Sequence, residues 1–218
     1  MAGFFEVLVH WRFLLDGVWW TLLISIVAML GGSLVGLVTA LARLSRFRAL
    51  DWAASLYIDF FRTTPLLVQL VWVYYALPIL TGISMSSFEA GSLAMSLYSG
   101  AFLSEIIRAG IFSIEKGQTE AAAALGMHPL QILQRIVLPQ ALARMIPPIT
   151  SSFITQIKDS GLCYVIAVPE LMRQAEALAA FTFRGSQTLT IAAFIYLGLT
   201  YPLSLIANTL QRRLAVVS

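Results

Sequence analysis

Between Gly17 and Ala42 the sequence runs for 26 residues without a charged side chain. A helix of about 20 apolar residues is long enough to cross the hydrocarbon core of a bilayer. Only a helix or a closed barrel can satisfy its backbone polar groups in lipid. The run therefore predicts a membrane-spanning helix. It is also too long for the hydrophobic region of a secretory signal, so we expect no cleaved signal here.

The composition agrees with a lipid environment. Of 218 residues, 59% are hydrophobic and 11% are charged, whereas soluble domains carry about 25% charged residues. The basic residues lie between the apolar runs and form no single patch, which argues against a nucleic-acid partner. Cys163 is the one cysteine, and no Cys/His cluster has metal-ligand spacing, so we expect neither an intramolecular disulfide nor a metal site.

Four further apolar runs follow the first, although the second is interrupted by Asp59, Arg62 and Pro65, and the fourth contains Lys158 and Asp159. We predict an all-α transmembrane fold, a five-span helical bundle that forms a single transmembrane domain over residues 1–218. The expected spans are 17–42, 52–80, 88–111, 141–168 and 186–210.

The basic residues predict the orientation of the bundle, because cytoplasmic loops carry an excess of Lys and Arg. With the C-terminus inside and the N-terminus outside, nine basic residues lie inside and three lie outside (Arg12, Arg173, Arg184). The inner set is Arg43, Arg46, Arg48, Arg108, Lys116, Arg135, Arg144, Arg212 and Arg213.

One cytoplasmic segment, residues 115–139, has a different pattern from the spans. An alanine-rich stretch ends at Gly126, which suits the left-handed residue after a helix. His128 is placed to cap a second helix, and Pro129 fits its first turn. We expect Pro139 to end that second helix. The segment thus predicts two short helices at the cytoplasmic face.

The same segment resembles the EAA loop of the membrane subunits of bacterial ATP-binding-cassette (ABC) importers, over 20 residues. An ordinary interfacial helix is the alternative, but it does not require this spacing. The resemblance implies a coupling helix that fits a cleft on a separate ATPase. Small alanines would allow close approach, and Glu120 is free to pair with a basic group. The expected coupling residues are Glu120, Ala121, Ala122, Gly126, His128, Pro129, Ile136, Leu138 and Pro139.

Other segments are similar to the polar amino-acid permeases of type I ABC importers, and together the similarity covers about 17–213. The matching segments are 61–69, Glu105 to Gln118, 139–141, 158–160 and 168–171. Residues 98–102 and Ser152 depart from the usual pattern, which bears on the amino acid carried. The resemblance implies a permease in the bacterial inner membrane that moves a polar amino acid from periplasm to cytoplasm.

The resemblance also implies partners. ATP and Mg would bind a partner ATPase dimer, because this chain has no GxxxxGK[ST] loop. We expect no cofactor and no catalytic residue here. A second permease subunit, the same or homologous, would complete the pathway. An extracytoplasmic solute-binding protein would touch the outer loops around Ser84–Glu89 and Pro169–Arg184.

Charged residues inside spans need partners or a function, because each costs roughly 2.5–3.5 kcal/mol on insertion scales. Glu105 and Arg108, three residues apart, are a candidate structural ion pair. The others either hold helices together or line a substrate path, and both readings stay open. The candidate path residues are Arg62, Thr63, Thr64, Pro65, Gln69, Tyr98, Ser99, Gln156, Lys158, Asp159 and Ser160.

Arg62 and Lys158 favour an acidic or amide substrate slightly, although a cationic one stays open. The main alternative function is an ion-coupled secondary transporter using Asp59, Asp159 or Glu105 as ion sites. Such transporters often contain two repeats, and this chain shows none. A membrane enzyme is a third class, but no nucleophile–base pattern supports it.

Overall fold

The computed structural model describes residues 2–215, and all regular structure in that range is helical. The long helices are α2 (Trp11–Arg43), α3 (Arg48–Thr63), α6 (Ser87–Phe112), α9 (Leu138–Asp159) and α11 (Gly185–Ala215). The shorter elements are α1 (Ala2–Val9), α4 (Leu66–Val71), a π-helical turn at Trp72–Ala76, α5 (Leu77–Thr81), α7 (Lys116–Ala124), α8 (Pro129–Ile132), a π-helical turn at Leu133–Val137, a 3-10 segment at Ser160–Ile166 and α10 (Leu171–Thr182). The expectation of an all-α fold is confirmed for these residues.

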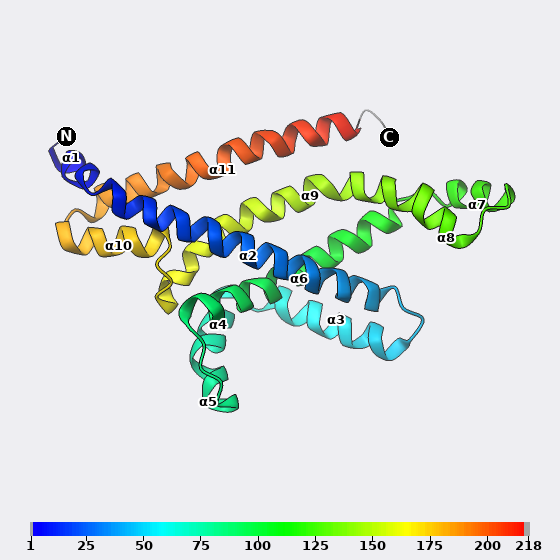
Figure 1. The fold of residues 1–218 in the computed structure, drawn as a ribbon, viewed down its shortest axis with the longest axis horizontal. Coiled ribbons are helices and arrows are strands. Elements are labelled where there is room, and N and C mark those ends of the chain that lie inside the picture. Colours follow the sequence, from blue (N-terminus) through cyan, green and yellow to red (C-terminus); the bar gives the residue numbers. More distant parts are fainter. Residues whose placement is uncertain (1, 216–218) are drawn as a thin grey trace.

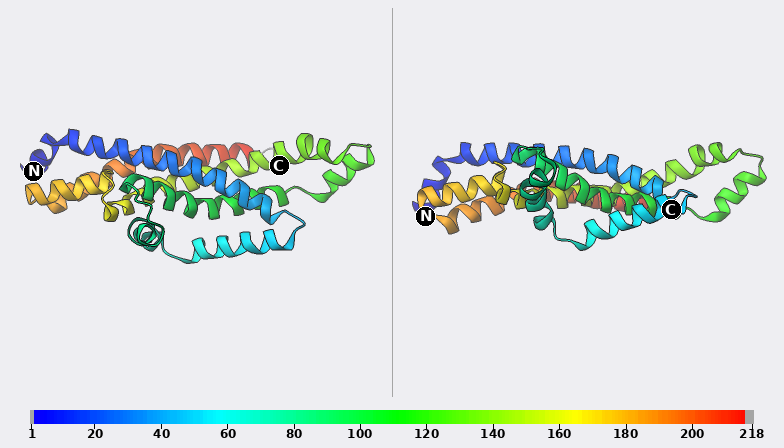
Figure 2. Two further views of the ribbon diagram at one scale, coloured as in Figure 1. Left: turned by 60° about the horizontal axis from the view of Figure 1, so that its bottom comes forward. Right: turned by 90° about the horizontal axis from the view of Figure 1, so that it is seen from below.

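The helices form an elongated bundle (Figure 1). Helix α2 packs along α6, and α9 and α11 run beside them. Helices α1 and α10 lie at one end, whereas α7 and α8 project beyond the bundle at the other end (Figures 1 and 2). The predicted spans 17–42, 88–111 and 186–210 fall within α2, α6 and α11, which are the three helices between residues 2 and 215 that are long and apolar enough to cross a membrane singly.

Small residues explain the close approach of α2 and α6. A Cβ atom on Gly32 would lie 2.1 Å from Ser99 Oγ, and one on Gly36 would lie 2.9 Å from Leu103 Cβ. Glycines four residues apart on one helix face allow this packing in membranes. In this chain the Gly32–Gly36 face therefore packs within the subunit.

The second predicted span is not one continuous helix. Thr64 and Pro65 are extended, and α3 and the α4–α5 segment meet at 105°. A proline disfavours helical geometry at the residue before it, so α3 must stop at Thr63. The interruption that the sequence indicates at Pro65 within the span 52–80 is thus a sharp break between two helices. Taken together, the two halves are long and apolar enough to cross a membrane as one broken span. With this pair, the described residues contain four candidate spans.

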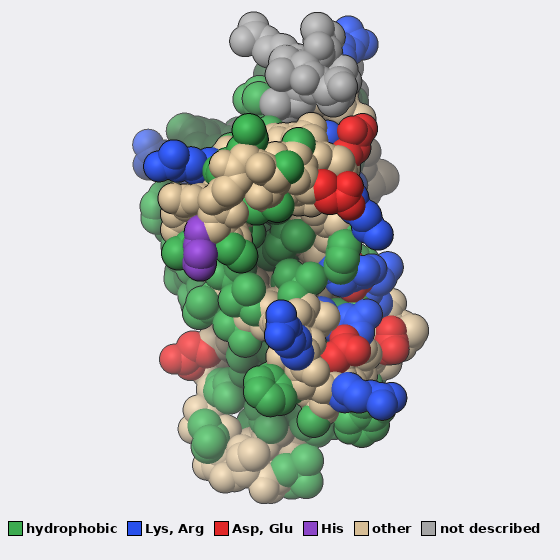
Figure 3. Space-filling model, turned by 90° about the vertical axis from the view of Figure 1, so that its right-hand side faces the viewer, with side chains coloured by type: hydrophobic (Ala, Val, Ile, Leu, Met, Phe, Trp, Pro, Cys, Tyr) green, Lys and Arg blue, Asp and Glu red, His purple; other side chains and the backbone are tan. Residues whose placement is uncertain are grey.

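The arm formed by α4, the π-helical turn and α5 projects from the bundle (Figure 1). From Thr63 to Phe88 the sequence contains no charged residue. The end of this arm, at the bottom of Figure 3, shows hydrophobic and uncharged side chains only. Side chains such as Ile79, 84% exposed, and Leu80, 71% exposed, suit a lipid or protein environment better than water.

The fourth predicted span differs more from expectation. Within residues 2–215, helix α9 is not among the helices that are apolar enough to cross a membrane singly. A 3-10 segment continues it to Ile166. Its polar side chains face a cavity within the bundle, described below. A helix that lines a polar cavity needs fewer apolar residues than one surrounded by lipid.

The sequence predicts that Pro139 ends the second short helix, and this prediction is wrong. The chain stays helical from Pro129 to Asp159, passing through a π-helical turn at Leu133–Val137 into the first turn of α9. The first turn of a helix needs no N–H from a proline, and a π-turn shifts the hydrogen-bond ladder locally. The coupling segment is thus continuous with α9.

Candidate functional site

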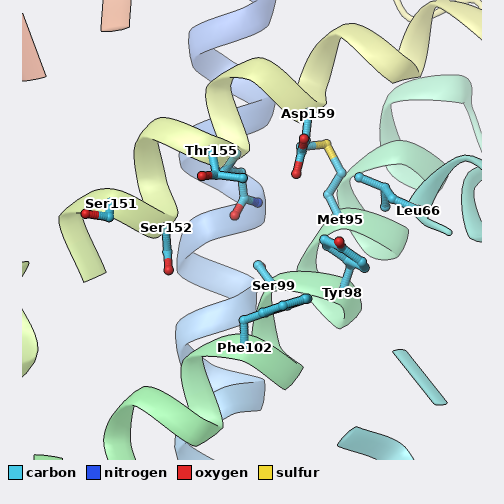
Figure 4. A pocket seen from close by; sticks show the side chains of 10 residues that line it. Leu66, Met95, Tyr98, Ser99, Phe102, Ser151, Ser152, Thr155 and Asp159 are labelled. Carbon is cyan, nitrogen blue, oxygen red and sulfur yellow. The ribbon is translucent and has the colours of Figure 1, made fainter. Parts of the chain in front are cut away.

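A pocket of about 280 Å³ lies between α6 and α9 and reaches the start of α4 (Figure 4). Its lining combines one carboxylate, one amide and several hydroxyl groups with apolar side chains. The lining residues are Leu66, Met95, Tyr98, Ser99, Phe102, Ser151, Ser152, Thr155, Gln156 and Asp159.

The polar groups come mainly from α9. Asp159 and Ser152 point from α9 toward α6 (Figure 4). Gln156 is only 4% exposed, yet neither its Nε2 nor its Oε1 atom has a hydrogen-bond partner among the described residues. Leaving a buried polar group unpaired costs about 1–3 kcal/mol. An unpaired amide beside a cavity is therefore well suited to a polar ligand.

Four of the predicted path residues line this pocket: Tyr98, Ser99, Gln156 and Asp159. Lys158 is exposed and is not part of the lining, because it lies on a different face of α9 from Thr155 and Asp159. Ser160 is buried, and its hydroxyl donates to the carbonyl of Ile157 at 2.7 Å.

The predicted residues around the break after α3 form a brace and do not line the pocket. The hydroxyls of Thr63 and Thr64 donate to the carbonyls of Asp59 and Phe60, each at 2.7 Å. The Gln69 amide donates to Thr64 Oγ1 at 2.7 Å and to the carbonyl of Thr64 at 3.1 Å. These bonds hold the extended Thr64–Pro65 segment and so position Leu66 at the pocket.

Arg62 lies just outside the pocket, with its guanidinium carbon 5.4 Å from the ring centroid of Phe102. Further along α6, Glu105 and Arg108 form an ion pair, in which Arg108 Nη2 lies 2.8 Å from Glu105 Oε2. The second bond of this pair runs from Arg108 Nε to Glu105 Oε1 at 3.1 Å.

Leu66, Met95, Ser151 and Thr155 line the pocket but are not among the predicted path residues. The signal was available in the spacing on α9, where Ser151, Thr155 and Asp159 recur every four residues. Residues at this spacing share one helix face. A polar face on an otherwise apolar helix is the pattern of a helix that lines a cavity.

The predicted coupling residues lie at the projecting end of the bundle. Gly126 adopts the left-handed conformation, with φ of 78°, and its N–H donates to the carbonyl of Ala123 at 3.0 Å. His128 caps α8, because its Nδ1 accepts from the N–H of Leu130 at 3.4 Å. The Gln140 amide donates to Gln118 Oε1 at 2.5 Å and so ties α7 to α9.

Most side chains of the hairpin formed by α7 and α8 are exposed. Glu120, Ala121, Gly126, Pro129 and Pro139 are exposed, whereas Ala122 is buried. At the tip, Leu125 is 83% exposed. Basic and acidic side chains both reach the surface at this end of the molecule (Figure 3). The hairpin therefore presents a mixed apolar and charged surface. At its base Leu138 is also exposed, and Ile136 is partly covered.

Comparison with known families identifies the chain. Residues 32–216 match the sequence model of the family described as "Binding-protein-dependent transport system inner membrane component". The chain belongs to this family. The resemblance to the polar amino-acid permeases of ABC importers is also confirmed, because the relatives described next are permease proteins of amino-acid transport systems.

Three relatives from Bacillus subtilis are permease proteins. The L-cystine transport system permease protein TcyB is 41% identical, over 94% of this chain and 87% of its own length. The arginine transport system permease protein ArtQ is 41% identical over 93% and 92%. The probable glutamine ABC transporter permease protein GlnM is 38% identical over 92% of each chain.

Solved structures agree with this family membership. A chain from the crystal structure of an amino acid ABC transporter with histidines superimposes with a TM-score of 0.91 at 34% identity, covering 96% of this chain and 98% of that one. A chain of the MetNI methionine ABC transporter, in an inward-facing conformation, has a TM-score of 0.77 at 22% identity and shows the shared fold.

Proposed function

We propose that the chain is the transmembrane subunit of an ABC importer that moves a polar amino acid from the periplasm to the cytoplasm. Family membership supports a transport role without chemistry on the substrate. The proposal includes the five-span arrangement in the bacterial inner membrane with the N-terminus outside. In that arrangement α9 supplies the fourth span and the broken α3–α5 pair the second.

The observation that carries the proposal is the pocket between α6 and α9. Asp159 suits the ammonium group that every amino acid carries. The unpaired Gln156 amide and the hydroxyls of Ser152 and Thr155 suit a neutral, hydrogen-bonding side chain. Such mostly neutral groups favour weak binding, which transport requires because the substrate must also leave.

This lining also revises the substrate preference that we drew from the sequence. Arg62 and Lys158 are the residues that favour an acidic substrate, and neither of them lines the pocket. Asp159 would repel an acidic side chain. We therefore propose the amide part of that preference: a substrate with a neutral polar side chain.

The partners follow from the projecting hairpin. Its exposed tip around Leu125, with Glu120 nearby, suits a cleft on an ATPase dimer that binds ATP and Mg. Because α8 continues into α9, movement of the hairpin would reach Asp159 along one helix. A second permease subunit and a solute-binding protein at the outer loops complete the proposed complex.

Competitive uptake tests the proposal. The complex with its ATPase and binding protein is reconstituted in proteoliposomes, and uptake of labelled L-glutamine is measured against unlabelled L-glutamate and L-arginine. We expect L-glutamine uptake and weak competition. Asp159→Asn should reduce uptake about tenfold or more, equivalent to the loss of one charge-assisted hydrogen bond, whereas the neighbouring Lys158→Gln should have little effect. Equal loss in both variants would contradict the assignment of Asp159.

A further inference from the structure

A second cavity, of about 210 Å³, lies between the inner end of α2, the second half of α3 and the last third of α6. It is unusually rich in charge for a membrane bundle, since two arginines and two carboxylates line it. The lining residues are Arg43, Ser55, Ile58, Asp59, Arg62 and Glu105.

This inner cavity follows the substrate pocket along α6. Glu105 comes seven residues after Tyr98, which is roughly 10 Å along a helix, in the direction of α7 and α8. Arg62 lines the inner cavity and Phe102 lines the substrate pocket, and the two side chains are in contact. The Arg62–Phe102 pair therefore stands between the two cavities.

Two of the four charged side chains that line the inner cavity, Asp59 and Arg62, are exposed in this subunit and belong to no ion pair in the described part of the chain. Among the side chains that the structure describes, the ion pairs are Arg43–Asp51, Glu105–Arg108 and Glu6–Arg184. The Nε atom of Arg43 is buried and has no hydrogen-bond partner among the described residues. Asp59 and Arg62 fall within the predicted span 52–80, and unpaired charges within a span are costly and usually mark a functional path.

We propose that the inner cavity is a second station on the translocation path, which receives the zwitterionic head group of the amino acid after it leaves the substrate pocket. The arginines would hold the carboxylate, and Asp59 with Glu105 would hold the ammonium group. Both signs of charge are present in equal number, which fits a zwitterion better than a free cation or anion. The inference rests on the proposed function of amino-acid transport.

The partners already present would keep binding at this station weak. Arg43 is paired with Asp51, and Ser55 Oγ lies 2.5 Å from Arg43 Nη1. Glu105 is engaged by Arg108. A ligand must compete with these bonds, so it gains less on binding than it would from free charges. Weak binding at successive sites is the condition for rapid passage.

Cysteine protection tests the second station. Cys163 is the one native cysteine and is buried, so an introduced thiol can be followed with a maleimide. Ser55→Cys reports on the inner cavity, Ser152→Cys on the substrate pocket, and Ser45→Cys, outside both cavities, is the control. The complex is studied in nanodiscs with whichever of L-glutamine, L-glutamate, L-arginine and L-cystine the wild-type complex transports fastest.

We expect this amino acid to slow labelling about fivefold at positions 55 and 152, the effect of a ligand at about four times its dissociation constant, and not at position 45. Protection at position 152 without protection at position 55 overturns the second station and leaves the proposed function intact. No protection at either position, together with no uptake, overturns both.

Transport measurements give an independent test that does not depend on the cysteine variants. Asp59→Asn and Arg62→Gln should each lower the amount of amino acid moved per ATP hydrolysed about tenfold, because each removes one charged contact at the station. Arg48→Gln, at the exposed start of α3, is the matched control and should keep the wild-type ratio. A wild-type ratio in both cavity variants overturns the second station.

Discussion

The guanidinium of Arg62 lies over the ring of Phe102, with 5.4 Å between the guanidinium carbon and the ring centroid. Arg62 is the last residue but one of α3, directly before the break, and Phe102 lies in the middle of α6. One contact thus joins the broken helix to the wall of the pocket that we propose binds the substrate. Any rearrangement of the break is expected to change the pocket as well.

Phe102→Ala should impair transport, because it removes the ring on which Arg62 rests. A cation–π contact contributes about 0.5–2 kcal/mol. We expect kcat for transport to fall about fivefold or more, while Phe102→Tyr, which keeps the aromatic ring, retains most of the activity. Uptake rates in proteoliposomes measure this. Equal activity of the alanine and tyrosine variants would show that the contact is unimportant.

Gln156→Met should separate function from stability. Methionine has a similar length and needs no hydrogen bonds, so removing the two unpaired buried atoms should leave the free energy of unfolding unchanged or raise it by about 1 kcal/mol. The substrate, in contrast, loses a polar contact, and KM should rise about tenfold. Gln211→Met, on the exposed end of α11, is the control. An unchanged KM with normal stability would remove Gln156 from the substrate path.

Gly32→Val should disrupt the packing of α2 on α6. Its Cβ would meet Ser99 Oγ at 2.1 Å, and Ser99 also lines the pocket between α6 and α9. Overpacking of this kind should lower the free energy of unfolding by about 1–3 kcal/mol. Thermal unfolding in detergent measures the loss. Gly198→Ala in α11 is the matched control, because a Cβ there has no neighbour within 4 Å, and it should be neutral or stabilising. A Gly32 variant as stable as this control would contradict the packing described here.

A buried carboxylate anchors α10 to the rest of the bundle. Glu170, in the loop between the fourth and fifth predicted spans, accepts hydrogen bonds from the N–H groups of Met172 and Arg173, each at 2.7 Å. The hydroxyl of Tyr196 on α11 donates to the same carboxylate at 3.0 Å. Burial raises the pKa of Glu170 to about 7, although these hydrogen bonds oppose the shift.

This raised pKa makes stability depend on pH. Between a pKa of 4.5 for an ordinary glutamate and about 7 in the folded state, the folded protein holds a proton that the unfolded chain releases. The contribution of Glu170 is therefore greatest below the lower value and is lost as the pH rises through about 7, by up to about 3 kcal/mol. Glu170→Gln should flatten the dependence of Tm on pH in this window, whereas the exposed Glu115→Gln should retain it. Identical profiles for Glu170→Gln and the wild type would disprove the assignment.

The sequence predicted the helical fold. The predicted spans 17–42, 88–111 and 186–210 fall within long apolar helices, because an uninterrupted apolar run of this length forms a helix in a membrane. It also placed Gly126 and His128 at the turn between α7 and α8. It did not predict the 105° bend at Pro65, because the direction of a broken helix depends on what both halves pack against. The helix continues through Pro139 because of a π-helical turn at Leu133–Val137, and no local sequence pattern predicts such a turn.

The lining of the pocket between α6 and α9 was predicted in part. Tyr98, Ser99, Gln156 and Asp159 were identified as polar residues inside spans, and the structure brings these four together. The sequence could not distinguish them from Thr63, Thr64 and Gln69, which are equally polar but hydrogen-bond to the backbone around the break. Whether a polar side chain faces a cavity or its own backbone is decided by tertiary packing.

The energy source for uptake tests the central claim most directly. Proteoliposomes containing the complex are loaded with or without ATP, and uptake of labelled amino acid is followed with and without a protonophore. The account predicts that uptake requires ATP, persists when the proton gradient is collapsed, and is lost in Glu120→Arg although the variant inserts normally. Uptake that continues without ATP and stops with the protonophore would contradict it and identify an ion-coupled transporter.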